Sequence, residues 1–288
     1  MNKIAIMTDS NSGITPDEAK CLSVGVIPMP FYIDEQLYFE GVSLSQEEFY
    51  EKLADEHEIN TSQPSPADLL FLWDETLKDH DSIVYIPMSS GLSSSCDTAK
   101  MLAQDYDGRV VVVDNRRVSV TQRQSVLDAV ELVKAGKSAE EIKEILETEA
   151  AQSSIYITLD TLKHLKKGGR ITPTAAAIGT VLNLKPVLQI NGEKLDAYGK
   201  VRGKKAAKEM MIAAMQNDFA EKFGGASPET VHLSAAYAGN PDEAQEWKRE
   251  LEEHFPGYAI HLAPLSLSVA CHIGQGALAV ACSKVIEL

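Results

Sequence analysis

The sequence predicts an α/β protein of two domains, and three observations lead to this prediction. The first half alternates apolar runs with helical segments, the second half contains a clear hairpin signal, and the 288 residues are enough for two cores. Apolar residues make up 44% of the chain, which indicates a packed interior. We expect an N-terminal α/β domain over residues 1–152, with a mostly parallel sheet and flanking helices, and a C-terminal α+β domain over residues 153–288.

Continuous apolar runs mark the strands of the N-terminal domain. Residues 82–88 (SIVYIPM) and 109–114 (RVVVVD) lack polar alternation, as parallel strands covered on both faces do. Residues 3–7 and 24–28 complete the expected sheet. Helices are expected between and after these strands, and their starts are indicated by the capping residues Thr15, Ser45, Ser65 and Ser138.

The C-terminal half changes character. Residues 185–190 and 194–201 flank Asn191-Gly192, a strong two-residue hairpin signal. Further strands are expected at 155–159, 230–236, 258–264 and 276–285, with long helices at 203–220 and 241–254. An antiparallel or mixed sheet with helices on one face follows from this order of elements.

Charge and composition exclude several partners. A formal net charge of −15 repels nucleic-acid phosphates and anionic lipid headgroups. The opening residues resemble a strand and not a signal peptide, and no apolar run approaches the roughly 18 residues needed to span a bilayer. We therefore expect a cytoplasmic protein without stable membrane insertion. The cysteines form no C-x-x-C pair, so we expect buried free thiols and no metal site; they are Cys21, Cys96, Cys271 and Cys282.

Three familiar motifs fail on inspection. Gly136-Lys137-Ser138 resembles the end of a phosphate-binding P-loop, but the glycine required five residues earlier is Glu131. No G-x-G-x-x-G follows the first strand. The stretch beginning Gly91-Leu92-Ser93 resembles a nucleophile elbow but closes on Ser95 where glycine is required. These failures argue against an ATPase, a dinucleotide enzyme and a standard serine hydrolase.

Two hydroxyl-rich segments remain. Residues 61–66 (TSQPSP) and 89–95 (SSGLSSS) each precede an expected helix, and the second follows a buried strand. Helix N-termini present unpaired N–H groups and favour anions, and hydroxyl groups there add donors. The alternative is that these residues only cap helices. The pattern leaves both interpretations open.

Two more residues are candidates for binding an anion. Arg170 directly follows a Gly168-Gly169 pair that we expect to move, and arginine is a bidentate partner for carboxylate or phosphate. His272 lies in a glycine-flanked apolar stretch just before the last strand, where glycines indicate close backbone approach. A surface arginine and a satisfied core histidine are the alternatives.

Taken together, five segments in order resemble the DegV family, the fatty-acid-binding proteins that serve bacterial fatty-acid kinase. They are Thr8-Asp9-Ser10, TSQPSP, SSGLSSS, LKKGGRI and HIGQGALA, within a likeness that runs from residue 3 to about residue 285. The resemblance implies a two-domain fold with the ligand at the interface and its acyl chain in a buried tunnel. It also implies that Thr61 and Ser93 bind the carboxylate, with Ser62, Ser94 and His272 beside them, and that Arg170 faces the kinase and the phosphate.

The expected function is therefore that of a carrier and not of an enzyme, with no cofactor. The resemblance implies a long-chain fatty acid as ligand, a separate ATP-dependent fatty-acid kinase as partner, and delivery of the acyl phosphate to acyltransferases. A serine-dependent acyl hydrolase or acyltransferase using Ser93 and His272 is the alternative from another class. A sugar- or triose-binding subunit of a related kinase is a third interpretation. Acyl length and unsaturation are left open by the sequence.

Overall fold

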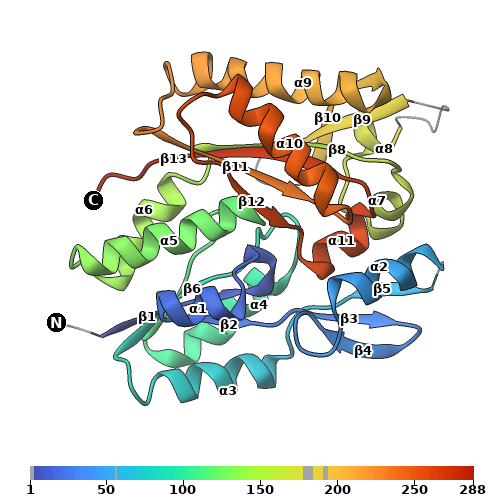
Figure 1. Cartoon of the computed structure of the whole chain (residues 1–288). Coiled ribbons are helices and arrows are strands. Elements are labelled where there is room, and N and C mark those ends of the chain that lie inside the picture. Colours follow the sequence, from blue (N-terminus) through green and yellow to red (C-terminus); the bar gives the residue numbers. More distant parts are fainter. Residues whose placement is uncertain (1–2, 56, 178–183, 191–193) are drawn as a thin grey trace. The chain divides into compact units, whose positions relative to one another are not determined.

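The computed structural model describes residues 3–55, 57–177, 184–190 and 194–288 (Figure 1). Its contacts divide the chain into two compact units. The first unit comprises Met1–Ser45, Glu58–Ala151 and Ile286–Leu288, and the second comprises Gln46–His57 and Gln152–Val285.

The first unit is built on a four-stranded parallel sheet in the order β2-β1-β6-β7. Alternate residues of β1 enter different cores. Ala5 and Met7 pack with α3 and α4, whereas Ile6 packs with α1, α5 and α6. Coverage on both faces confirms the prediction from the continuous apolar runs. The strands are β1 (Ile4–Asp9), β2 (Val24–Ile27), β6 (Ser82–Ile86) and β7 (Val110–Val112).

Three helices of the first unit begin where capping residues were expected. Thr15 and Ser65 accept backbone N–H groups at the starts of α1 and α3, and Ser138 forms a reciprocal capping box with Glu141 at the start of α6. The helices are α1 (Pro16–Leu22), α3 (Pro66–Thr76), α4 (Ser95–Ala103), α5 (Val120–Lys134) and α6 (Ala139–Thr148), with short 3-10 turns at Ser10–Ser12 and Gln104–Tyr106.

A small antiparallel sheet in the first unit was not predicted. It has the order β4-β3-β5, with β3 (Pro30–Ile33), β4 (Gln36–Phe39) and β5 (Ile59–Thr61). The turn between β3 and β4 has Asp34 and Glu35 at φ 48° and 66°. Two successive left-handed residues are typical of a tight hairpin, but that conformation is usually indicated by Asn-Gly or Asp-Gly. Asp-Glu therefore concealed the hairpin from sequence analysis.

The second unit contains a six-stranded sheet that is mixed, one of the two arrangements that the sequence predicted, and its strand order is β10-β9-β8-β13-β11-β12. Only the β11–β12 pair within it is parallel. The expected turn at Asn191-Gly192 lies outside the described residues, but Ile190 pairs with Leu195 across the antiparallel β9–β10 ladder. The strands are β8 (Ser153–Thr158), β9 (Leu184–Ile190), β10 (Leu195–Arg202), β11 (Val231–Tyr237), β12 (His261–Pro264) and β13 (Leu278–Lys284).

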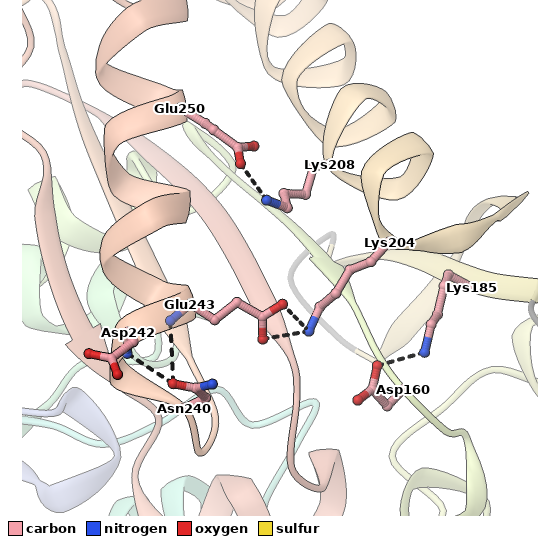
Figure 2. Close-up of polar contacts among 8 residues, drawn as sticks. All are labelled: Asp160, Lys185, Lys204, Lys208, Asn240, Asp242, Glu243 and Glu250. Atoms are coloured by element: carbon pink, nitrogen blue, oxygen red, sulfur yellow. Dashed lines mark hydrogen bonds and ion pairs between the residues drawn. The ribbon is translucent and has the colours of Figure 1, made fainter.

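Two long helices cover one face of this sheet. Side chains of α9 (Gly203–Asn217) and α10 (Pro241–His254) share one hydrophobic cluster with β11 and β13, and Trp247 in that cluster donates to the Ala279 carbonyl at 3.0 Å. Figure 2 shows the polar contacts beside it. Lys204 pairs with both carboxylate oxygens of Glu243 at 2.7 Å, and Lys208 pairs with Glu250. Such partly exposed pairs each contribute about 1 kcal/mol or less to stability. Apolar packing therefore supplies most of the free energy that holds the two helices together.

The remaining helices of the second unit are short. A π-helical turn at Asp218–Lys222 continues α9. The others are α2 (Gln46–Ala54), α7 (Lys163–Gly168), α8 (Pro173–Ala176) and α11 (Leu267–Ile273).

The division of the chain into units departs in two places from the expected single boundary near residue 152. Helix α2 was expected in the N-terminal domain, but it groups with the second unit, where the Gln46 side chain donates to the Leu265 carbonyl at 3.2 Å. The chain end returns to the first unit, and Ile286 packs on its α5 and α6 core. Local sequence patterns predict elements but carry no signal for such exchanges, because the contacts join residues far apart in the chain; Gln46 and Leu265 are 219 positions apart.

The four cysteines are thiols and not disulfides, but one expectation about them is wrong. Cys96, Cys271 and Cys282 are buried, whereas Cys21 is exposed because it lies on the outer side of α1. Burial raises the pKa of Cys96 to about 12, which makes that thiol unreactive. Within the described ranges, no helix is long and apolar enough to cross a membrane.

Asn240 is the N-cap residue of α10, and its substitution tests how much a capping residue contributes to stability. Its side-chain oxygen accepts the N–H groups of Asp242 and Glu243 at 3.0 and 3.3 Å (Figure 2). Asn240→Ala should lower the free energy of unfolding of the second unit by about 1 kcal/mol, whereas Asn240→Asp retains the acceptor and should change it by a few tenths. Urea unfolding followed by Trp247 fluorescence in a Trp73→Phe background measures this unit selectively. An unchanged midpoint in the alanine variant would show that the cap contributes nothing.

Candidate functional site

The first hydroxyl segment is held by strand pairing. Thr61 ends β5 opposite Phe31, and the Ser62 N–H donates to the Pro30 carbonyl at 3.2 Å. Thr61 is partly buried and Ser62 is exposed. Ser65, by contrast, is the N-cap of α3. The capping interpretation therefore applies to Ser65 and not to Thr61, whose backbone belongs to a strand.

The second hydroxyl segment folds into a turn between β6 and α4. The N–H groups of Leu92 and Ser93 both donate to the Ser89 carbonyl, at 3.0 and 3.1 Å, and the Gly91 N–H donates to the Ser89 hydroxyl at 3.2 Å. The partly buried Ser93 hydroxyl accepts the Ser95 N–H at 3.2 Å. This turn places the Ser93 hydroxyl at the positive end of α4.

Gln63, which sequence analysis did not single out, links the two segments. Its side-chain oxygen accepts hydrogen bonds from the hydroxyl groups of Ser94 and Thr98, at 3.3 and 3.1 Å. Ser94 occupies the N-cap position of α4 but makes no side-chain cap bond there. The structure thus brings the segment containing Thr61 and Ser62 to the N-terminus of α4, where Ser93 and Ser94 lie. Residue spacing contains no signal for a bond that joins positions 31 and 35 residues apart.

The Thr8-Asp9-Ser10 motif is used inside the protein. Thr8 donates to the Ile86 carbonyl at 2.7 Å, and the Ser10 hydroxyl accepts the Met29 N–H at 3.0 Å. The Asp9 carboxylate is fully buried and accepts the Met88 N–H at 2.8 Å. Burial raises the pKa of Asp9, although its hydrogen bonds act in the opposite direction. These residues support the loops at the strand ends.

Arg170 belongs to the second unit and follows helix α7. Gly169 ends that helix in the left-handed conformation at φ 69°, and its N–H donates to the Leu165 carbonyl. The Arg170 guanidinium donates to the Gly168 carbonyl at 2.5 Å, while the Arg170 carbonyl accepts the Leu195 N–H at 3.1 Å. The glycine pair thus forms a hydrogen-bonded helix terminus, and the chain beyond it is bonded to β10. The expectation that the pair moves stays a prediction.

His272 lies in α11, a helix that was not predicted from the sequence. Ser266 caps this helix, which has only seven residues, too few to show a helical period. The helix packs against α7 so closely that a Cβ atom on Gly168 would meet His272 Nδ1 at 2.2 Å. Similarly, a Cβ atom on Gly274 would meet His164 Cδ2 at 2.7 Å. The expectation of close backbone approach around His272 is confirmed.

Arg170 and His164 lie close enough to His272 to affect its protonation. Burial, followed by the nearby Arg170 and His164, lowers the pKa of His272 to about 4. Burial, together with Lys163 and Lys167, also lowers the pKa of His164. At neutral pH both imidazoles are uncharged. They can therefore donate or accept one hydrogen bond at each ring nitrogen, next to a permanently charged guanidinium.

The fold and these residues define a class: an α/β protein with one unit built on a doubly covered parallel sheet and another built on a mixed sheet covered by two long helices. The chain belongs to the DegV family, because the sequence model of that family matches residues 3–285. A DegV domain-containing protein from Deinococcus radiodurans is 35% identical over 279 residues, which cover 96% of this chain and 97% of that protein.

Solved structures show the same architecture. A DegV family protein from Thermus thermophilus, described by its fatty-acid binding, is 30% identical and superimposes with a TM-score of 0.89 over 98% of this chain and 100% of its own. DegV from Bacillus subtilis, described as a fatty-acid-binding protein, is 26% identical with a TM-score of 0.86 over 99% of this chain and 100% of its own.

The close contact between His272 and Gly168 gives a pH prediction. The His272 C2 proton should titrate with a midpoint of about 4 by NMR. Gly168→Ala should displace the ring toward water and move the midpoint up toward about 6.5. Because the folded pKa is the lower one, the stability contribution of His272 is complete above about pH 6.5 and is lost as pH falls toward 4; this loss should shrink in the variant.

Gly169→Ala is the matched control for this experiment. It introduces backbone strain at φ 69°, but its Cβ atom has no neighbour within 4 Å among the described atoms. Its His272 midpoint should stay near 4. A midpoint that moves equally in both variants would show that general loosening, and not contact with Gly168, controls the ring.

Proposed function

We propose that this protein binds one long-chain fatty acid, with the tail in a buried tunnel, and presents its carboxylate to a separate ATP-dependent fatty-acid kinase. The observation that carries this proposal is the likeness, over 98% of the chain, to the Thermus thermophilus protein described by its fatty-acid binding. The description of the Bacillus subtilis relative supports it independently. In this proposal the protein is a carrier that then delivers the acyl phosphate to an acyltransferase, and phosphate transfer is the work of the partner kinase.

The physical chemistry of a fatty acid divides the work between tail and head group. Burying about 14 methylenes yields roughly 11 kcal/mol before ordering and association costs, at about 0.8 kcal/mol for each. A buried carboxylate without hydrogen bonds would cost several kcal/mol. In the proposal Thr61 and Ser93 offset that cost, with Ser62, Ser94 and His272 as further donors. The hydroxyl groups at the N-terminus of α4 support the assignment, because both they and the helix end favour an anion.

The hydroxyl assignment is tested by substitution. Thr61→Ala and Ser93→Ala should each weaken binding of a fluorescent fatty acid by about tenfold to a hundredfold, since a hydrogen bond to a charged group is worth about 1.5–3 kcal/mol. Ser65→Ala is the control in the same segment, because its hydroxyl caps α3; it should lower stability and leave affinity unchanged.

The binding measurement is paired with native mass spectrometry and lipid extraction of the purified wild-type protein. A near-stoichiometric fatty acid is the expected result. Unchanged affinity in a folded variant that carries both Thr61→Ala and Ser93→Ala would remove Thr61 and Ser93 from the head-group site. Labelling of Ser93 by a fluorophosphonate probe would indicate a serine hydrolase and overturn the carrier proposal.

Arg170 should matter for phosphate transfer more than for holding the acid. An acyl phosphate carries more negative charge than a carboxylate, over several oxygens that a guanidinium meets with two parallel hydrogen bonds. Arg170→Ala should bind fatty acid nearly as the wild type does but fail as a substrate of fatty-acid kinase, with Arg170→Lys intermediate. Fluorescence affinity and kinase-dependent phosphorylation measure the two effects.

Lys166→Ala is the matched control, because it removes one exposed positive charge from α7. Its phosphorylation should remain close to wild type. Loss of fatty-acid binding in Arg170→Ala would place the arginine in the primary carboxylate site, and unaffected phosphorylation would make it a surface arginine without this role.

A further inference from the structure

A buried polar network joins the loops that follow β1, β6 and β7. Its centre is Gln122 on α5, a side chain with no exposed surface. The Gln122 side-chain nitrogen lies 3.1 Å from the Thr8 hydroxyl, 3.1 Å from an Asp9 carboxylate oxygen and 3.2 Å from the Ile86 carbonyl. One amide group therefore contacts the ends of both central strands of the parallel sheet.

The network continues from Gln122 to the turn that contains Ser93. The second Asp9 oxygen accepts the Met88 N–H at 2.8 Å. The next residue, Ser89, accepts the N–H groups of Leu92 and Ser93 on its carbonyl, at 3.0 and 3.1 Å. A path of hydrogen bonds and one peptide unit thus leads from α5 to the backbone of Ser93.

The loop after β7 is fastened to the same network. The Arg117 carbonyl accepts the Ser89 N–H at 2.8 Å, and the Ser119 N–H donates to the Asn11 carbonyl at 3.0 Å. Ser119 has φ 57° and ψ −136°, a conformation that a residue with a side chain rarely adopts. Backbone strain of this kind persists where surrounding contacts require it, and here the loop is hydrogen-bonded to the loops that follow β1 and β6.

Stabilisation alone is a weak explanation for this arrangement. Replacing both partners of a buried polar pair by apolar groups of the same shape is often neutral or stabilising, whereas a buried carboxylate such as Asp9 is costly. What a polar network supplies and an apolar core does not is direction, because its hydrogen bonds determine where each loop backbone runs.

We propose that Gln122, acting through Asp9, is a positioning residue for the Ser93 hydroxyl. It holds the turn at residues 88–93 in the conformation that directs this hydroxyl toward the carboxylate of the ligand. The inference rests on the proposed function, since it assumes that Ser93 contacts a fatty-acid carboxylate. Gln122 itself makes no contact with the ligand in this scheme.

A double-mutant cycle tests the positioning role. Gln122→Met keeps the length of the side chain and removes its donors, and affinity is measured for palmitic acid and for hexadecanol, which has the same tail length without a carboxylate. Gln122→Met should weaken palmitate binding by about tenfold, a coupling of ordinary size for a connected network, and change hexadecanol binding less than about threefold. In a Ser93→Ala background, Gln122→Met should cause no further loss of palmitate affinity.

Two further variants make the cycle decisive. Asp9→Asn preserves shape but replaces one of the two oxygens that accept from Met88 and Gln122 by an NH2 donor, so it should reproduce the selective loss even if Gln122→Met folds poorly. Val126→Ala is the control for general destabilisation, because Val126 lies on the same helix in the apolar core. It should leave the ratio of palmitate to hexadecanol affinity unchanged.

The outcomes separate this inference from the proposed function. Equal losses for acid and alcohol, or a loss for Gln122→Met that adds fully to that of Ser93→Ala, would overturn the positioning role and leave fatty-acid binding intact. A wild-type protein that binds neither ligand would instead overturn the proposed function.

Discussion

The burial of the Asp9 carboxylate is the constraint on which the first unit depends. A carboxylate without exposed surface needs donors, and Asp9 obtains them from the Asn11 N–H, the Met88 N–H and the Gln122 side chain. These donors come from the loop after β1, the loop after β6 and helix α5. Satisfying one buried group therefore determines how three separate segments meet at the carboxyl end of a parallel sheet, which is where α/β proteins bind ligands.

The second unit meets a constraint of a different kind, the space between two short helices. Helix α11 approaches α7 so closely that Gly168 and Gly274 leave no room for a Cβ atom beside His272 and His164. Gly276 has the same relation to the Asp160 carboxylate, at 2.1 Å. The resulting burial keeps His272 uncharged at neutral pH. The absence of a side chain at Gly168 and Gly274 thus allows the close packing that lowers the pKa of His272. This explains why glycines lie near both Arg170 and His272 in the sequence.

The proposed ligand is an anion, and the chain itself carries a net charge of −15. Long-range attraction therefore contributes nothing to capture of a fatty acid, and recognition must depend on local donors and on burial of the tail. Hydroxyl groups and a helix N-terminus satisfy a single negative charge without a permanent cation. Positive charge is concentrated around α7, at Lys163, Lys166, Lys167 and Arg170, which suits the larger charge of a phosphate.

Local patterns alone determined most of the elements and the candidate residues of this protein. Continuous apolar runs predicted the doubly covered sheet, and Thr15, Ser65 and Ser138 marked helix starts correctly, because these signals act over a few residues. The resemblance of five short segments indicated the family that the comparison confirms. The roles assigned to Thr61, Ser93, His272 and Arg170 stay predictions.

Tertiary structure alone decided the rest. The grouping of α2 with the second unit, the link from Gln63 to Ser94, the neutral state of His272 and the central place of Gln122 all depend on contacts between residues far apart in the chain. The sequence supplies the side chains that form such a contact, but only the packing of the folded chain brings them together. Burial then sets their charge and their partners, and neither distance nor burial is encoded in the spacing of residues along the chain.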